Sequence, residues 1–212
     1  MKNKKELAVL LSKLKNFTQP KAHFEQYPTP AELAAEVLWY AHLSKDISGK
    51  KIVDLGCGNG IFGLGALLLG AKEATLLDID EDALAIAKEN HAFLEKTLGK
   101  KLIMRLIHAD IRNYDITCDV VFQNPPFGVQ TKHADKLFLE TAMITAPTIY
   151  TMHKKETSAF VRKIAHDHNY EATPIFPDQA FVLKATQKFH TKNKREIGVT
   201  VWKLSKGSLS GL

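Results

Sequence analysis

The chain has 212 residues, with 29 Lys and Arg against 23 Asp and Glu, a net charge of +6 and a pI near 9.2. This length fits one domain with a substantial core, and the basic balance favours an anionic partner. No apolar run is long enough to span a membrane, no signal-peptide pattern begins the chain, and Cys57 and Cys118 suggest neither a disulfide framework nor a metal-binding pair. We therefore expect a soluble, cytoplasmic protein.

The first part of the chain predicts two helices with a stiff connection between them. Apolar residues at helical spacing indicate helices over residues 4–14 and 30–41. Pro28 and Pro30 exclude regular helix in the connection, and Thr29 is a candidate N-cap for the second helix. The connection can be read as a simple capping linker or as a lid over a small ligand. The candidate lid residues are Gln26, Tyr27 and Thr29.

Apolar strands then alternate with helical patterns, as in a doubly wound α/β sheet. The last two strands, over residues 171–185 and 196–204, have no helical pattern between them and can pair as an antiparallel hairpin. The sequence therefore predicts a mostly parallel, seven-stranded, Rossmann-like sheet with helices on both faces and a C-terminal hairpin. The other strands are expected at 51–55, 74–79, 102–107, 120–122 and 147–152, and the helices at 61–69, 81–98, 135–146 and 156–168.

A glycine-rich turn follows the first predicted strand, in the sequence Asp54-Leu55-Gly56-Cys57-Gly58-Asn59-Gly60. Glycines let the backbone come close to a ligand that a Cβ atom would keep away. Asp78 ends the second strand and can accept both hydroxyls of a ribose. Asp110 ends the third strand and can accept from an adenine amino group, with Ile111 beside the ring.

This turn has two competing interpretations besides a ligand-free turn. Residues 58–63 match the GxGxxG fingerprint of dinucleotide-binding proteins. The longer pattern of Asp54 with three alternating glycines, followed by acids at two strand ends, resembles the S-adenosylmethionine site of class I methyltransferases. On that reading the donor-binding residues are Gln26, Tyr27, Thr29, Asp54, Gly56, Gly58, Asn59, Gly60, Asp78, Ile79, Asp110, Ile111 and Asn124.

A second motif, Asn124-Pro125-Pro126-Phe127, decides between these interpretations. Two prolines stop the preceding strand at its carboxyl end, where open α/β sheets bind ligands. The motif resembles that of class I methyltransferases that modify planar amino nitrogens, and a dehydrogenase has no need of it. The Asn124 side-chain oxygen and the Pro125 carbonyl can accept the hydrogens of such a nitrogen, while Phe127 stacks on its ring. Methyl transfer would then depend on positioning, and no metal is implied.

An RNA acceptor would have to present a flipped or unpaired nucleotide. Cations and aromatic residues placed near the same sheet edge could contact its phosphates and bases. Each of these segments could instead be an ordinary solvated loop. The candidate RNA-binding residues are Lys132, His153, Lys154, Lys188, Phe189, His190, Lys192, Lys194 and Arg195.

Five stretches together resemble the small-subunit ribosomal RNA adenine-N6 methyltransferases of archaea and eukaryotes, the methyltransferase-like five family. They are residues 25–29, 54–58, 78–84, 124–128 and 188–190. The resemblance covers nearly the whole chain and implies S-adenosylmethionine as donor, a lid formed by residues 26–29 and an adenine held by residues 124–127. It implies a single methyltransferase domain over residues 1–212. Its parts would be N-terminal helices and lid (1–45), a donor-binding half (50–125) and an acceptor and RNA-binding half (126–212).

The resemblance also implies a partner, a small zinc-containing activator protein of the Trm112 type that binds by strand addition. The candidate strand is Leu102–Ile107, because the third strand lies at an edge in the usual order and is unusually apolar here. The alternative is a short edge covered by the protein's own loops.

Other functions remain open at this point. The acceptor could be guanine N2, DNA adenine or a protein glutamine, although Phe127 counts against glutamine because that class usually has tyrosine there. A non-catalytic RNA-binding module is a further alternative, and intact Asn124 and Asp78 count against it.

Overall fold

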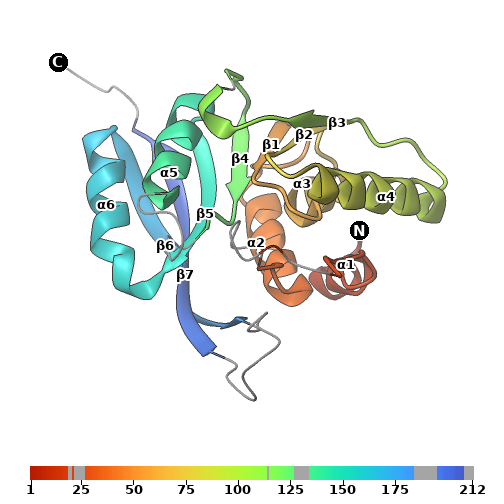
Figure 1. Cartoon of the computed structure of the whole chain (residues 1–212), viewed down its shortest axis with the longest axis horizontal. Helices are drawn as coiled ribbons and strands as arrows, with labels where there is room; N and C mark the ends of the chain where they lie inside the picture. Colours follow the sequence, from red (N-terminus) through yellow and green to blue (C-terminus); the bar gives the residue numbers. More distant parts are fainter. Residues whose placement is uncertain (19–20, 22–26, 114, 127–133, 184–194, 208–212) are drawn as a thin grey trace.

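The computed structural model describes residues 1–18, 21, 27–113, 115–126, 134–183 and 195–207. Their strands form one seven-stranded sheet in the order β3-β2-β1-β4-β5-β7-β6 (Figure 1). Strands β1 to β5 are parallel, and β7 runs antiparallel to both β5 and β6. The predicted mixed sheet with a C-terminal hairpin is therefore confirmed. The strands are β1 Lys51–Leu55, β2 Glu73–Asp78, β3 Met104–His108, β4 Val120–Gln123, β5 Thr148–Lys154, β6 Tyr170–Leu183 and β7 Arg195–Lys206.

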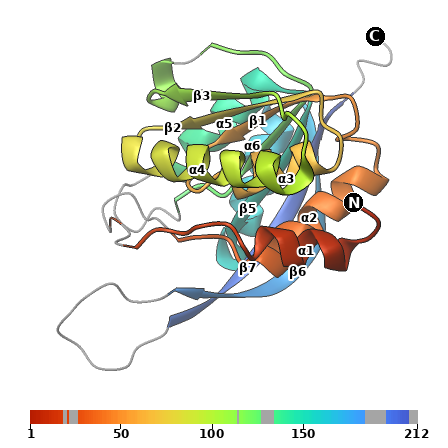
Figure 2. The ribbon, with the colours of Figure 1, turned by 90° about the vertical axis from the view of Figure 1, so that its right-hand side faces the viewer.

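Helices cover both faces of the sheet, as Figures 1 and 2 show. One face packs against the first four helices and the other against the last two. The first group is α1 Lys4–Leu11, α2 Ala31–Leu43, α3 Ile61–Leu68 and α4 Glu81–Leu98; the second is α5 Ala134–Thr145 and α6 Ser158–Asp167, with short 3-10 turns η2 Ile111–Asn113 and η3 Lys155–Thr157. None of the described helices has the length and apolarity needed to cross a bilayer.

Strand β4 illustrates why the central strands are largely apolar. Successive side chains of a strand point to opposite faces, so a strand between two helix layers buries both of its sides. Phe122 stacks between Phe62 and Tyr150 on the α1–α4 face, with ring centroids 5.8 and 5.0 Å away. Its neighbour Val121 packs on the α5–α6 face, in the same cluster as Trp202. The strand therefore contacts the core on both faces of the sheet, and it ends at Gln123, immediately before the Asn124 motif.

Helix boundaries follow local signals at α4 and depart from them at α2. Asp80 caps α4 by accepting from the Asp82 N–H at 3.1 Å, and Gly99 ends the helix with φ +63°, so the predicted bounds are observed. The predicted N-cap role of Thr29 is wrong. Pro30 occupies the cap position of α2, and the Thr29 hydroxyl accepts a tertiary hydrogen bond from Asn124 instead.

The third strand begins later than predicted, at Met104, and does lie at an edge of the sheet with β2 as its described neighbour. At the other edge, the β6–β7 hairpin is long and extends beyond the rest of the sheet (Figure 2). The register of β6 shifts on either side of Phe176, close to Pro174 and Pro177, because a proline cannot donate to the ladder.

Candidate active site

A cavity of about 700 Å³ lies at the carboxyl ends of β1, β2 and β4. This is the crevice where open α/β sheets bind ligands, and its volume suits a nucleoside-sized molecule. Eight of the predicted donor-site residues line it together with Tyr27, Thr29 and Asn124. The lining residues are Phe17, Tyr27, Pro28, Thr29, Asp54, Gly56, Cys57, Gly58, Asn59, Ile61, Phe62, Asp78, Ile79, Ala109, Asp110, Ile111, Arg112, Asn124, Pro126, Ala134, Leu137 and Phe138.

Asp54 stabilises the glycine turn through a hydrogen bond to the helix that follows it. Its side chain is 2% exposed, and Oδ2 accepts from the Gly63 N–H at 2.8 Å, which fastens the end of β1 to the first turn of α3. Burial, with Asp78 nearby as a second negative charge, raises the pKa of Asp54 to about 8. A cation in the cavity would favour the ionised form of this carboxyl group.

Asp78 holds the other side of the same turn. One carboxylate oxygen accepts from the Gly58 N–H at 2.8 Å, and the other accepts from the Asp80 N–H at 3.0 Å. Because each carboxylate oxygen has two lone pairs, both keep the capacity to accept from a ribose hydroxyl. Burial raises the pKa of Asp78, against these backbone hydrogen bonds.

Asp110 lines the cavity, but its carboxylate already has a strong partner. Arg112 donates from Nε to Oδ1 at 3.0 Å and from Nη2 to Oδ2, and its backbone N–H also reaches Oδ1. The Arg112 hydrogen bonds hold the pKa of Asp110 below its ordinary value. The pair keeps the acid ionised and oriented at the cavity, which Ile111 also lines.

Asn124 presents an unused acceptor at the cavity. Its Nδ2 donates to Thr29 Oγ1 at 3.1 Å, which orients the amide. The Oδ1 atom is buried and has no hydrogen-bond partner among the described residues. A buried acceptor without a partner is costly, so this oxygen is suited to a donor that arrives with a ligand. Pro126 lines the cavity beside it.

Two predicted donor contacts have mainly structural roles. The Asn59 side chain faces the N-terminal segment, where Nδ2 donates to Asn16 Oδ1 at 2.6 Å and to the Lys15 carbonyl at 3.2 Å. Gly60 is not among the lining residues, and its role as a donor contact stays a prediction. Its φ is +81°, and a Cβ atom there would come within 2.8 Å of Leu76, so this glycine permits close packing between the turn and the sheet.

The prediction that His153 contacts RNA is also wrong. The residue is 2% exposed, and burial lowers the pKa of its imidazole to about 3, so it is a neutral core residue. Its Nε2 hydrogen-bonds Thr151 Oγ1 at 2.8 Å, and that oxygen accepts from Gln123 Nε2 at 3.1 Å. The chain of three buried side chains supports β4 immediately before Asn124. Its neighbour Lys154 is partly exposed at the end of β5.

Several predicted site residues lie outside the described residues. They are Gln26 of the lid, Phe127 of the acceptor motif, and Lys132, Lys188, Phe189, His190, Lys192 and Lys194 of the proposed RNA surface; for Arg195 the same holds of the side chain. Among the residues that are described, no group of three His, Cys, Asp or Glu side chains could hold a metal ion.

The sequence interpretation missed Phe17, Asn90 and Arg112. Phe17 lines the cavity although it precedes the first predicted strand by more than 30 residues, so no local pattern connects it to the site. Asn90 lies within the helix predicted over residues 81–98 and is 1% exposed, but nothing in the sequence interpretation singled it out. Arg112 could have been found from its spacing, because it stands two residues after the predicted Asp110.

Comparison with known proteins agrees with this geometry. The family model of the methyltransferase small domain matches residues 33–150. The chain is 37% identical to the uncharacterized protein MJ0284 of Methanocaldococcus jannaschii, over 97% of this chain and 95% of that protein. It is 35% identical to the rRNA N(6)-adenosine-methyltransferase METTL5 of Danio rerio, over 92% of this chain and 95% of that protein.

A solved structure of a candidate RNA methyltransferase, PH1948 from Pyrococcus horikoshii, superposes with a TM-score of 0.84 at 37% identity, covering 98% of this chain and 100% of that one. The chain therefore belongs to the methyltransferase small domain family and, within it, to the group that contains the rRNA N(6)-adenosine-methyltransferases.

Proposed function

We propose that this chain is an S-adenosylmethionine-dependent methyltransferase that modifies N6 of a flipped or unpaired adenosine in small-subunit ribosomal RNA. The observation that carries the proposal is the buried Oδ1 of Asn124, which has no partner among the described residues and belongs to a nucleoside-sized cavity. The curated relative named above acts on rRNA adenosine N6 according to its name, and the chain covers nearly all of that protein.

The residues of the cavity fit a methyl donor made of an adenosine and a sulfonium amino acid. Asp78 would hold the ribose, and the Asp110–Arg112 pair beside Ile111 would hold the adenine. The glycine turn, kept in shape by Asp54, would leave room for the methionine end. When bound, S-adenosylmethionine supplies an electrophilic methyl group.

The acceptor turn would supply positioning. Asn124 Oδ1 and the Pro125 carbonyl would each accept one hydrogen of the adenine amino group, which turns the nitrogen lone pair out of conjugation and toward the donor. The Thr29 hydroxyl keeps the amide in the orientation that leaves Oδ1 without a partner among the described residues. Because the amide is held before the substrate arrives, little rearrangement is needed at the moment of transfer.

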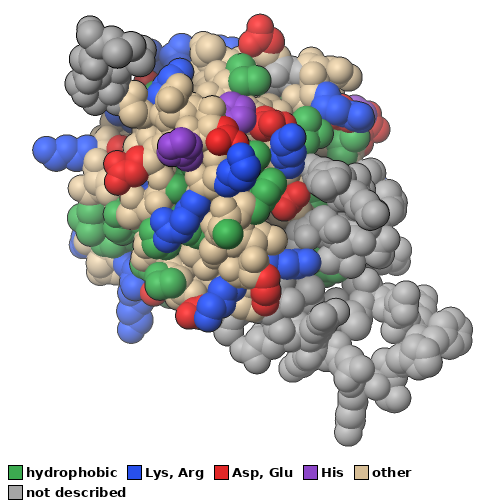
Figure 3. All heavy atoms as spheres, turned by 90° about the vertical axis from the view of Figure 1, so that its left-hand side faces the viewer, with side chains coloured by type: hydrophobic (Ala, Val, Ile, Leu, Met, Phe, Trp, Pro, Cys, Tyr) green, Lys and Arg blue, Asp and Glu red, His purple; other side chains and the backbone are tan. Residues whose placement is uncertain are grey.

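The RNA would approach past Lys154 at the end of β5, and the cations of residues 188–195, most of which lie outside the described residues, would contact it. On the side of the molecule that carries α6, Lys and Arg side chains are interspersed with acidic ones (Figure 3). Several of these cations are paired, such as Lys163 with Asp167 at 2.6 Å. A ribosomal substrate also fits the cytoplasmic location that the sequence predicts.

The test is methyl transfer from labelled donor to total rRNA, DNA and protein. We expect label in small-subunit rRNA, recovered as N6-methyladenosine after digestion to nucleosides. Label that appears only in protein, or in RNA as a methylated guanine, would refute the acceptor assignment.

We propose in addition that β3 binds a Trm112-type, zinc-containing activator by strand addition. Among the described strands β3 lies at the edge, and Ile103 beside it is 59% exposed. An open apolar edge is a site for pairing with a second chain. Size-exclusion chromatography of the chain with and without such a protein tests this partner proposal. Absence of a complex, together with full activity of the chain alone, would refute it.

A further inference from the structure

Among the described residues between α1 and the lid, Phe17 reaches the donor cavity with its side chain. Phe17 lines the cavity, and its ring lies over Gly58: a Cβ atom added to that glycine would sit 3.5 Å from the ring's Cζ. Gly58 has φ +55°, so the turn presents bare backbone to the ring. This segment precedes the part of the chain that the family model matches.

Two buried amides fasten the segment just before Phe17. Asn90 of α4 accepts from the Lys15 N–H at 2.7 Å, and it donates to the Lys15 carbonyl at 3.1 Å and to the Asn59 carbonyl at 3.0 Å. Asn59 donates to the same Lys15 carbonyl from the glycine turn. The backbone of Lys15 is therefore bound to both the helix and the turn, only two residues from the ring.

A second anchor follows Phe17. Lys21 Nζ lies 2.7 Å from Asp80 Oδ1 and 2.7 Å from Asp82 Oδ2. Asp80 is 4% exposed, and its own N–H donates to Asp78, the acid at the cavity. An exposed ion pair contributes little, whereas a buried carboxylate needs its partner. Figure 2 shows the chain after α1 running alongside α4 toward this end of the sheet.

We propose that residues 15–18 together with Lys21 form a strap that builds one wall of the donor site. In this strap Phe17 is a donor-contact residue, and Asn90 is a positioning residue that acts through it. The identity of the ligand rests on the proposed function; the existence of the wall rests on the contacts above. The strap explains why the side chains of Asn90 and Asn59 both hydrogen-bond to Lys15, in an N-terminal segment that carries no catalytic motif.

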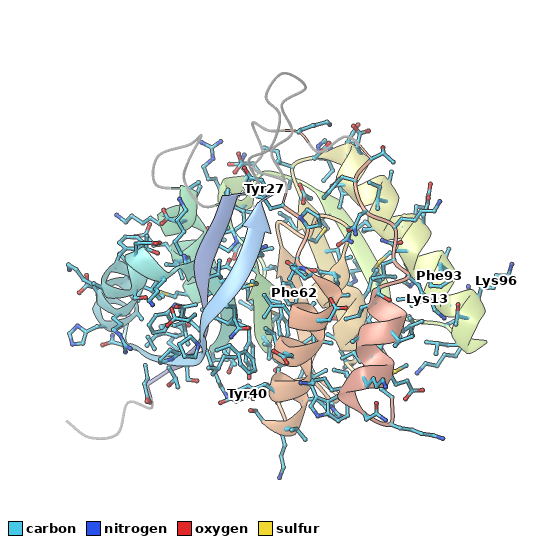
Figure 4. All side chains as sticks on the ribbon, turned by 90° about the horizontal axis from the view of Figure 1, so that it is seen from below. Lys13, Tyr27, Tyr40, Phe62, Phe93 and Lys96 are labelled. Atoms are coloured by element: carbon cyan, nitrogen blue, oxygen red, sulfur yellow. The ribbon has the colours of Figure 1, made fainter. Side chains whose placement is uncertain are left out.

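Calorimetric binding of S-adenosylmethionine and S-adenosylhomocysteine to the full chain tests the proposal. Phe17→Ala should weaken both ligands about tenfold or more, since burying a phenylalanine ring against a ligand is an effect of that size. Phe17→Leu should retain most of the affinity because it keeps an apolar wall. Phe93→Ala is the matched control: Phe93 is 37% exposed on α4 and lies away from Tyr27 in Figure 4, so its removal should change neither affinity.

Asn90→Ala separates positioning from plain stability. If Asn90 acts through Phe17, its loss should weaken donor binding, and the double variant with Phe17→Ala should be hardly weaker than either single one. Additive losses would overturn the positioning role. Hydrogen exchange gives a reading in the unmodified protein, in which donor should slow exchange of the Lys15 amide; no slowing would overturn the strap.

The outcomes for the two proposals are distinguishable. Tight donor binding by the unmodified chain together with unchanged binding by Phe17→Ala would overturn the strap and leave the methyltransferase assignment intact. Failure of the unmodified chain to bind either ligand would overturn the donor assignment and the strap with it.

Discussion

The side-chain amide of Asn124 donates to the hydroxyl of Thr29 at 3.1 Å, across 95 residues of sequence. The bond joins the segment expected to cover the donor to the turn expected to hold the acceptor. It also decides which end of the amide is available, because Nδ2 is occupied and Oδ1 is left without a partner among the described residues. The segment expected to cover the donor and the turn expected to hold the acceptor are therefore directly linked.

Thr29→Val should slow methyl transfer about tenfold. Valine matches the shape of threonine but cannot accept from Nδ2, so a buried donor is left unsatisfied at a cost of about 1–3 kcal/mol and the amide loses its fixed orientation. Single-turnover rates at saturating donor and RNA measure the effect. Thr29→Ser keeps the hydroxyl and should stay close to the unmodified rate; equal rates for Val and Ser would show that the bond is unimportant.

Asn124→Ala should reduce the transfer rate by about two to three orders of magnitude and leave donor affinity within a few fold. The side chain contacts the acceptor amino group in the proposed arrangement, and loss of one positioned hydrogen-bonding group in a catalytic site has an effect of this size. Rate and donor affinity are measured on the same preparation. A variant with weakened donor binding but an unchanged rate at saturating donor would contradict the assignment.

Asp78→Ala should act on the donor first. Removal of hydrogen bonds to a carboxylate costs about 1.5–3 kcal/mol, so the donor dissociation constant should rise by about 10- to 100-fold. The rate at saturating donor should fall less than the affinity. Asp167→Asn provides the comparison, because that acid is on α6 at the opposite face and should alter neither quantity. Unchanged donor binding in Asp78→Ala would remove this residue from the site.

His153 should make the protein less stable as the pH falls from about 6.5 toward 3. The folded state holds the imidazole neutral, with a pKa of about 3, whereas the unfolded chain takes up a proton near the ordinary value of 6.5. The unfolded state therefore binds more protons than the folded state in this window. As the pH falls, the contribution of His153 to the free energy of unfolding declines by up to about 1.4 kcal/mol per pH unit.

Chemical denaturation of the unmodified protein and of His153→Gln over this pH range measures that contribution. The variant should show a shallower loss of stability with acid. His166→Gln, at a site where the side chain is 91% exposed, should leave the slope unchanged. The same slope in the unmodified protein and in His153→Gln would show that His153 is accessible to protons in the folded state, contrary to its burial.

Local patterns in the chain were enough for the sheet and for the outline of the site. Asp80 caps the start of α4 and Gly99 ends it. Both act on residues close to them in the chain, so their effect can be predicted from the sequence. The glycine turn and Asp78 are separated by one βαβ unit, and the parallel fold brings the ends of neighbouring strands to one edge. The doubled proline after β4 likewise stops its strand by purely local chemistry.

Contacts between distant segments were not readable in this way. The sequence pattern around Thr29 suits a helix cap, yet its hydroxyl is bonded to Asn124. His153 follows a strand and precedes two lysines, which suggested an exposed site, but its direction is set by the alternation of β5 between two covered faces. Phe17 and Asn90 belong to the site only because α1 and α4 pack on the same side of the sheet.

The sequence by itself determined the class I sheet, the donor turn and the acceptor motif, because each rests on residues adjacent in the chain or on the ends of neighbouring strands. Only the tertiary structure decided which side chains face the cavity and which are occupied elsewhere. The physical reason is that a buried polar group must find a partner, and packing chooses the partner: Lys15 for Asn90, Thr151 for His153, and none of the described residues for Asn124 Oδ1.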